Sequence, residues 1–222
     1  MNPYKILLFD LDGTLSDPKV GITKSVQYAL EKMNMVEADL DKLDVFIGPP
    51  LQASFAEHYQ FDEETTQTAI LWYRERFNDK GMYENEMYQG IPELLQSLKE
   101  QGSTLVVATS KPTVFAEQIL TYFKINQYFN SIVGSHLDGT RTSKTEIIQY
   151  ILDKYNAHQV DEFIMIGDRK HDIIGAHNTG IDSIGVTYGY GSPEEVSGAN
   201  PTYIAGSVQE LQHVLLGDVA IK

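Results

Sequence analysis

The chain has 222 residues, of which 42% are hydrophobic, and this length suffices for one full core and a smaller appended unit. No apolar run approaches the roughly 18 residues that span a bilayer, and the first residues lack a secretory pattern, so we expect a cytoplasmic protein that binds no membrane. A formal charge of −14 argues against nucleic-acid polymers as partners, and the absence of cysteine excludes disulfides and a cysteine nucleophile.

The first predicted element is a strand over Ile6 to Phe9, an apolar run typical of a strand buried on both faces. It ends in two acids, Asp10 and Asp12, followed by Gly13. Alternation along an extended chain places both carboxylates on one side, at the edge where open α/β sheets bind ligands. Two carboxylates this close call for a cation such as Mg²⁺. An acidic surface turn is the alternative that this stretch alone leaves open.

Residues 16–85 form a block of predicted helices with no convincing strand. Helical spacing of apolar residues predicts a first helix from Ser16, and a second helix is expected from about Leu51. A third helix begins at Asp62, a good N-cap residue, and stops near Gly81. The block therefore has the form of an insertion into another domain.

Beyond Gly90 the pattern alternates between helices and short apolar strands, which is typical of a parallel sheet covered by helices on both faces. Strands are predicted at 104–109, 131–133, 163–166 and 183–186, and helices at 92–101, 113–123, from the capping box at 143–146, at 172–178 and at 207–215. The fold class is therefore α/β, with a core domain at 1–15 and 86–222 and an inserted all-α domain at 16–85.

Several polar residues follow the predicted strands or begin the helices at this same sheet edge: Thr109, Lys144, Asp168 and Asp172. Each has an ordinary explanation as a turn, cap or solvated residue. A parallel sheet, however, brings the ends of its strands together, so acids, a hydroxyl and a lysine gather around one crevice.

Such a set suits phosphoryl transfer, in which a metal and cations match the charge on the phosphoryl oxygens. Asp10 is the predicted nucleophile and forms an aspartyl phosphate. Asp12 is the predicted acid and base, which protonates the leaving oxygen and then activates water. Lys144 balances charge, Thr109 hydrogen-bonds a phosphoryl oxygen, and Asp168 completes the metal shell.

At these residues the sequence resembles the haloacid dehalogenase superfamily, whose four motifs are matched in order. The matching positions are Asp10-Leu11-Asp12-Gly13-Thr14-Leu15, Thr109, Lys144 and Gly167-Asp168-x-x-x-Asp172. The resemblance implies a Rossmann-like three-layer core and a helical cap of the first type at 16–85. It also implies Mg²⁺ bound by Asp10, the Asp12 carbonyl and Asp168, with Asp172 as a further ligand or as support for one.

Within the superfamily, dehalogenases lack the acid at Asp12, and mutases resembling β-phosphoglucomutase often have valine at Thr14. The chain is more similar to the phosphoglycolate phosphatase-like and 5′-nucleotidase-like branches, and the segment before Lys144 resembles the latter. Candidates for substrate contact are Ser110, Lys111, Arg141 and Gly48, the last in a turn that resembles the cap's specificity loop. Surface turns or a helix connection explain the last three equally well.

The resulting prediction is a Mg²⁺-dependent phosphatase, monomer or homodimer, that hydrolyses a small phosphomonoester such as a nucleoside monophosphate or a phosphoglycolate-like compound. Inorganic pyrophosphatase, sugar-phosphate phosphatase and phosphoglucomutase are alternatives within the superfamily. A non-catalytic signalling module that accepts phosphate on Asp10 is an alternative of another class, as is a binding protein on a degenerate phosphatase fold. A signalling receiver, however, needs no helical insertion after its first acid, and no reactive position is missing from this sequence.

Overall fold

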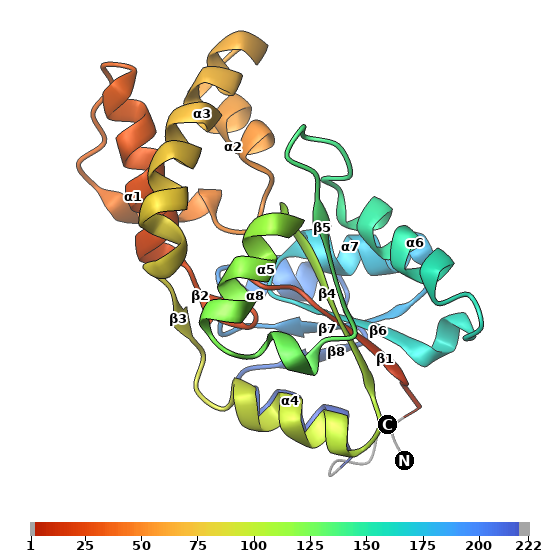
Figure 1. Ribbon diagram of the computed structural model, residues 1–222. Helices are drawn as coiled ribbons and strands as arrows, with labels where there is room; N and C mark the ends of the chain where they lie inside the picture. Colours follow the sequence, from red (N-terminus) through yellow and green to blue (C-terminus); the bar gives the residue numbers. More distant parts are fainter. Residues whose placement is uncertain (1–2, 218–222) are drawn as a thin grey trace. The chain divides into compact units, whose positions relative to one another are not determined.

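The structure, a computed structural model, describes residues 3–217 (Figure 1). The chain divides after Ser16 and after Glu86: Asp17–Glu86 form one compact unit, and the remaining described residues form the other. These divisions lie one residue beyond those expected from the sequence. None of the helices in residues 3–217 is long and apolar enough to cross a membrane.

The larger unit is built on a sheet of parallel strands in the order β5-β4-β1-β6-β7-β8. Strand β1 is central, and its Leu8 is aligned with Val106 of β4 and Met165 of β6. Because every pairing is parallel, all strands end at the same edge, where their following loops meet. The strands are β1 (Ile6–Phe9), β4 (Thr104–Pro112), β5 (Ser131–Ser135), β6 (Phe163–Gly167), β7 (Asp182–Val186) and β8 (Tyr203–Ala205).

Helices cover both faces of this sheet, which confirms the predicted three-layer, Rossmann-like α/β fold (Figure 1). One face carries α6 and α7, and their side chains share a buried cluster with alternate residues of β1, including Ile6 and Leu8. Each such buried aliphatic side chain contributes about 1.5–3 kcal/mol to folding. The helices of this unit are α4 (Ile91–Glu100), α5 (Thr113–Tyr122), α6 (Lys144–Lys154), α7 (Lys170–Thr179), α8 (Pro193–Gly198) and α9 (Val208–Leu216), with short 3-10 turns at Asn126–Tyr128 and Val160–Glu162.

The smaller unit is helical, and α1 packs on α3. The α1 helix also lies close to the segment after α3 because Gly21 has no side chain: a Cβ there would overlap the Gly81 carbonyl. The Asp62 carboxylate accepts a hydrogen bond from the Thr65 amide and caps α3, as predicted. The unit contains α1 (Lys19–Lys32), α2 (Leu51–Tyr59), α3 (Glu63–Asp79) and 3-10 segments at Leu40–Phe46 and Gly81–Tyr83.

Several predicted boundaries were wrong. The first helix begins at Lys19, because Ser16–Asp17 forms a short strand (β2) that pairs with β3 (Glu86–Met87). Helix α7 begins at Lys170, two residues before the predicted start. Strand β8 and helix α8 were missed, since each has too few residues for a periodic pattern to show.

The predicted helix caps differ in how fully they form. The capping box of α6 is complete, with reciprocal bonds between Ser143 and Glu146. At α9 the Ser207 hydroxyl accepts from the Glu210 amide as predicted, but the Glu210 carboxylate accepts from the Gly206 amide and not from that of Ser207. The start of α6, which carries a predicted site residue, is therefore well fixed.

Candidate active site

Asp10 is the first residue after β1, and its backbone amide continues the sheet by donating to the Ile166 carbonyl of β6 (2.9 Å). Its side chain is buried. Oδ1 accepts a hydrogen bond from the Leu11 amide (2.7 Å) and lies 2.8 Å from the Lys144 ammonium. The end of the strand therefore presents a carboxylate that is fixed from two sides.

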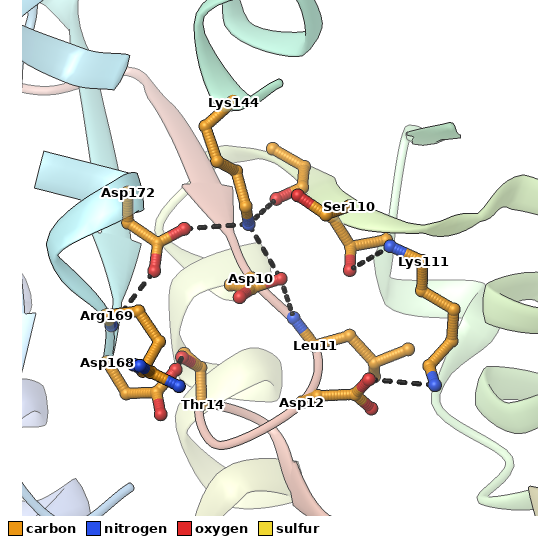
Figure 2. Close-up of polar contacts among 12 residues, drawn as sticks. Asp10, Leu11, Asp12, Thr14, Ser110, Lys111, Lys144, Asp168, Arg169 and Asp172 are labelled. Carbon is orange, nitrogen blue, oxygen red and sulfur yellow. Dashed lines mark hydrogen bonds and ion pairs between the residues drawn. The ribbon is translucent and has the colours of Figure 1, made fainter. Parts of the chain in front are cut away.

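Lys144 is the first residue of α6. Its buried ammonium lies between Asp10 and Asp172 (2.7 Å from Asp172 Oδ1) and donates to the Ala108 carbonyl (2.8 Å), as Figure 2 shows. Burial lowers the pKa of Lys144, but the two carboxylates outweigh burial and raise it overall. The lysine is therefore a fixed positive charge between two acids.

Asp168 and Asp172 bring two further carboxylates to Asp10, from the end of β6 and the first turn of α7 (Figure 2). One oxygen of each of the three acids lies within 4.8 Å of the others, and all three are buried. The backbone amide of Tyr190 holds Asp168 Oδ2 (2.7 Å), and the amide of Arg169 holds Asp172 Oδ2 (3.1 Å). A different backbone amide thus fixes each acid of the cluster.

The charge of this cluster fits a divalent cation. Three buried carboxylates face one lysine, so the cluster carries an excess of negative charge. Burial raises the pKa of Asp168 well above its ordinary value, and the neighbouring acids Asp172 and Asp10 raise it further. Burial likewise raises the pKa of Asp172 to about 6, although Lys144 opposes the rise. A bound cation would restore the charged forms, and carboxylate oxygens are the ligands that Mg²⁺ prefers.

The Asp12 carboxylate has a different partner from those of the other acids. Its Oδ2 lies 2.8 Å from the Lys111 ammonium, and both side chains are buried (Figure 2). Burial raises the pKa of Asp12, with Lys111 opposing. Asp12 Oδ1 is also buried and has no hydrogen-bond partner among residues 3–217. The expectation that Asp10 and Asp12 share one cation through their carboxylates does not fit this arrangement, because Lys111 supplies the charge beside Asp12.

Lys111 belongs to an irregular part of β4. The register against β5 shifts between Ala108 and Pro112, so residues 109–111 lie in a bulge, a feature that re-aims side chains. Strand β4 thus continues past its predicted end and carries Lys111 to Asp12.

The two hydroxyl side chains of this bulge are both engaged. The Thr109 hydroxyl accepts from the Lys111 amide (3.2 Å), which fixes the buried threonine at the sheet edge. The Ser110 hydroxyl donates to the Thr142 carbonyl (3.0 Å), in the loop before α6. Ser110 therefore connects the bulge to that loop by a hydrogen bond.

Arg141 and Gly48 are two further residues predicted to contact the substrate. The Arg141 guanidinium donates twice to the Gly134 carbonyl, from Nε (2.9 Å) and Nη2 (2.7 Å), so the structure does not direct it to the acid cluster. Gly48 belongs to the smaller unit, with φ of 101° in the turn before α2. Among the described residues, no hydrogen bond or ion pair within its own unit joins either residue to the acid cluster.

The loop after β7 was missed by sequence reasoning. Its Tyr190 amide holds Asp168, and the Tyr188 hydroxyl donates to the Thr14 carbonyl (3.0 Å), so the loop also fixes the turn that follows β1. Gly189 permits this approach, since a Cβ there would overlap Asp168. Only the loop's position after a strand could have indicated its role, because backbone groups make much of the contact.

Buried acids, a lysine and a threonine at the carboxyl edge of a parallel sheet define the class of a phosphoryl-transfer enzyme. Comparisons with known proteins agree. The family model described as haloacid dehalogenase-like hydrolase matches residues 7–186. The chain therefore belongs to this family, as predicted, and it is a phosphatase of the family, a phosphoric monoester hydrolase.

Relatives match over nearly the whole chain. It is 49% identical to a 5′-nucleotidase of Pseudomonas aeruginosa over 96% of each protein, and 27% identical to a phosphoglycolate phosphatase of Vibrio parahaemolyticus over 95% of this chain and 96% of that one. The crystal structure of a predicted phosphatase from Clostridium acetobutylicum shares 53% identity, with a TM-score of 0.94 and coverage of 96% of this chain and 99% of that one.

Proposed function

We propose that this protein is a Mg²⁺-dependent phosphatase that hydrolyses nucleoside monophosphates through a phosphorylated Asp10. The observation that carries the proposal is the Lys144 ammonium fixed between Asp10 and Asp172, with Asp168 completing a buried acidic cluster. Such a site concentrates negative charge that its lysine alone does not balance, which favours a divalent cation; the cation and Lys144 together can then offset the charge of a phosphoryl group.

Asp10 is the nucleophile in this proposal. Both of its side-chain contacts with described residues are made by Oδ1, so Oδ2 is the oxygen that we assign to attack on phosphorus. A P–O bond forms to Asp10 as the bond to the leaving oxygen breaks, and water then displaces phosphate from the aspartyl group. Lys144 holds the carboxylate in place and offsets the charge of the approaching phosphoryl group.

Asp12 is the proposed general acid and base. Its Oδ1, which has no hydrogen-bond partner in the described part of the chain, is the atom that we expect to give a proton to the leaving oxygen and later to accept one from water. Lys111 orients the carboxylate through Oδ2 and places a positive charge beside the substrate phosphate. The buried Thr109 hydroxyl is the proposed donor to a phosphoryl oxygen.

Asp10, Asp168 and Asp172 would hold the Mg²⁺, with the Asp12 backbone carbonyl as a further ligand. When bound, the ion stabilises negative charge on the phosphoryl oxygens. The chain's own contribution is to keep its carboxylates oriented, through the backbone amides that each fix one oxygen of Asp168 and of Asp172.

A nucleoside monophosphate is the proposed substrate class, because the 5′-nucleotidase relative is 49% identical over almost the whole of both chains. Phosphoglycolate is the second candidate, supported by a relative at 27% identity. We assign selection between them to the Asp17–Glu86 unit as a cap domain, with Gly48 in its specificity turn. The cytoplasmic location and the monomer or homodimer state stay predictions.

The test is hydrolysis of p-nitrophenyl phosphate and of a panel of nucleoside monophosphates, phosphoglycolate, sugar phosphates and pyrophosphate. We expect turnover that requires Mg²⁺, is abolished by EDTA and is restored by added Mg²⁺, with the highest kcat/KM for a nucleoside monophosphate. A metal-independent activity would contradict the proposed cofactor. Preference for phosphoglycolate would contradict the proposed substrate and leave the chemistry standing.

A further inference from the structure

The loop between β5 and α6 contains a residue in an unusual backbone conformation. Arg141 has φ of 51°, in the left-handed region that side chains other than glycine rarely adopt. It lies three residues before Lys144, the first residue of α6. Such a conformation persists only where the surrounding contacts hold it, so the contacts of Arg141 show what fixes this loop.

The Arg141 side chain joins the two elements on either side of its own loop. Its Nε and Nη2 both donate to the carbonyl oxygen of Gly134 in β5, at 2.9 and 2.7 Å. Its guanidinium also lies over the ring of Tyr150 in α6, 4.6 Å from the ring centre. The planar guanidinium thus connects the end of a core strand to the helix that carries Lys144.

A second set of contacts ties the same region to the bulge of β4. The Ser110 hydroxyl donates to the Thr142 carbonyl (3.0 Å), on the residue after Arg141. Gly134 also approaches the Lys111 backbone so closely that a Cβ on Gly134 would overlap the Lys111 carbonyl. The start of α6 is therefore fixed both to β5 and to the bulged segment of β4.

We propose that Arg141 is a positioning residue for Lys144 and not a ligand of the substrate phosphate. The Lys144 ammonium makes three contacts that need a well-placed helix start: Asp10 (2.8 Å), Asp172 (2.7 Å) and the Ala108 carbonyl (2.8 Å). Loosening the Arg141 contacts lets the first turn of α6 shift, and the flexible lysine side chain then occupies this arrangement less of the time. The inference rests on the role of Lys144 in the proposed function.

The test is steady-state kinetics of Arg141→Ala with a nucleoside monophosphate and Mg²⁺. Alanine keeps the Cβ, so the cost of the positive φ is unchanged and only the guanidinium and its stem are lost. We expect kcat to fall about tenfold, while KM and the inhibition constant of inorganic phosphate stay within about twofold. A raised KM and weaker phosphate inhibition with unchanged kcat would indicate a substrate ligand and overturn the inference, as would kinetics like those of the parent protein.

Variants of the neighbouring ring supply matched controls. Tyr150→Phe keeps the ring under the guanidinium and should keep full activity, whereas Tyr150→Ala removes it and should lower kcat in the same direction as Arg141→Ala. Arg141→Lys keeps the charge but cannot make the two-donor contact, so it should resemble Arg141→Ala. Full activity of both Tyr150→Ala and Arg141→Lys would overturn the inference even if Arg141→Ala failed to fold.

Lys144→Met separates this inference from the proposed function. Unchanged activity of Lys144→Met would refute the role of Lys144 itself. If Lys144→Met is impaired, adding Arg141→Ala should cause no further loss of kcat, because both changes act through one group. An additional loss of about tenfold in the double variant would show that Arg141 acts independently of Lys144 and would contradict the inference.

Discussion

At the scale of residues, two acids separated by one leucine have different surroundings. Asp10 is held by a backbone amide and by Lys144, whereas Asp12 is paired with Lys111 and has one buried oxygen without a partner among the described residues. A nucleophile must stay ionised and fixed, and a general acid must be able to carry a proton. The two environments therefore match the two roles proposed for the pair.

This division predicts how the effect of Asp12→Asn depends on the leaving group. p-Nitrophenolate leaves without protonation, whereas the ribose oxygen of a nucleoside monophosphate needs a proton. We expect kcat/KM to fall by about 10²–10⁴-fold for the nucleoside monophosphate and by much less for p-nitrophenyl phosphate, since kcat/KM reports the first step. Equal losses for the two substrates would contradict the role of Asp12 as the acid.

The positions of Asp10 and Lys144 were predictable from sequence, because a parallel sheet must bring strand ends and the following helix starts together. The pairing of Lys111 with Asp12 was not predictable, since it depends on a bulge whose register shift leaves no pattern in the sequence. The hydrogen bond from Tyr190 to Asp168 was not predictable for another reason. Its donor is a backbone amide, which every residue except proline has.

At the scale of elements, α8 braces the start of α7. The Glu195 carboxylate accepts from Arg169 Nε (2.8 Å) and from the Lys170 amide (3.0 Å). The backbone amide of Arg169 holds Asp172 in turn. The brace therefore fixes the segment between two of the proposed metal ligands, Asp168 and Asp172.

Glu195→Gln should weaken metal binding for this reason. Contacts that orient metal ligands are typically worth about 10–100-fold in affinity, and we expect the Mg²⁺ concentration for half-maximal activity to rise about tenfold. The neighbouring exposed Glu194 offers a matched control, and Glu194→Gln should leave this concentration unchanged. Identical Mg²⁺ titrations of the two variants would show that the brace has no such role.

Within the smaller unit, Arg76 of α3 and Glu84 form a two-bond ion pair (2.8 and 3.1 Å). Hydrogen bonding to Arg76 lowers the pKa of Glu84 below its ordinary value of 4.5. A carboxylate whose pKa is lower in the folded state stabilises the fold above its ordinary pKa, and this stabilisation is lost as the pH falls through the lowered value. The pair should therefore stabilise this unit at neutral pH and not in acid.

Glu84→Gln should lower the free energy of unfolding by about 1 kcal/mol near neutral pH. The difference in Tm between the variant and the parent protein should shrink as the pH falls through the lowered pKa of Glu84, where the parent carboxylate also loses its charge. Thermal denaturation followed by circular dichroism measures both. A Tm difference that is constant with pH would mean that the charge of Glu84 contributes nothing to stability.

The length of an element decided whether the sequence pattern could predict it. Strand β1 was identified correctly because its whole length is apolar and an acid follows it at once. Strand β8 has three residues, one of them exposed, and its pairing with β7 defines it as a strand. Helix α8 is six residues long and its place is fixed by a brace to α7, so tertiary contacts and not local periodicity define both elements.

At the scale of the whole molecule, the proposed function gives different tasks to the two units. All of the proposed catalytic and metal-binding side chains lie in the larger unit, whereas Gly48 lies in the smaller one. Chemistry common to many phosphate esters and selection among those esters can therefore be changed separately.

Gly48→Ala should alter selection and leave the chemistry intact. The φ of 101° at Gly48 is unfavourable for alanine, so the turn before α2 is expected to shift. We expect KM for the nucleoside monophosphate to rise several-fold while kcat for p-nitrophenyl phosphate is unchanged. Gly102→Ala is a matched control, because Gly102 also has a positive φ (85°) and a Cβ there would meet open space. Equal effects of the two variants would argue against a specificity role for the Gly48 turn.

The covalent role of Asp10 is tested most directly by trapping the phosphorylated protein. Mg²⁺-loaded protein is mixed with a nucleoside monophosphate, quenched in acid during turnover and digested, and its peptides are analysed by mass spectrometry. We predict a phosphoryl adduct on the peptide that contains Asp10, at that residue, and no adduct and no turnover in Asp10→Asn. Sustained turnover by Asp10→Asn, or an adduct on another residue, would contradict the account.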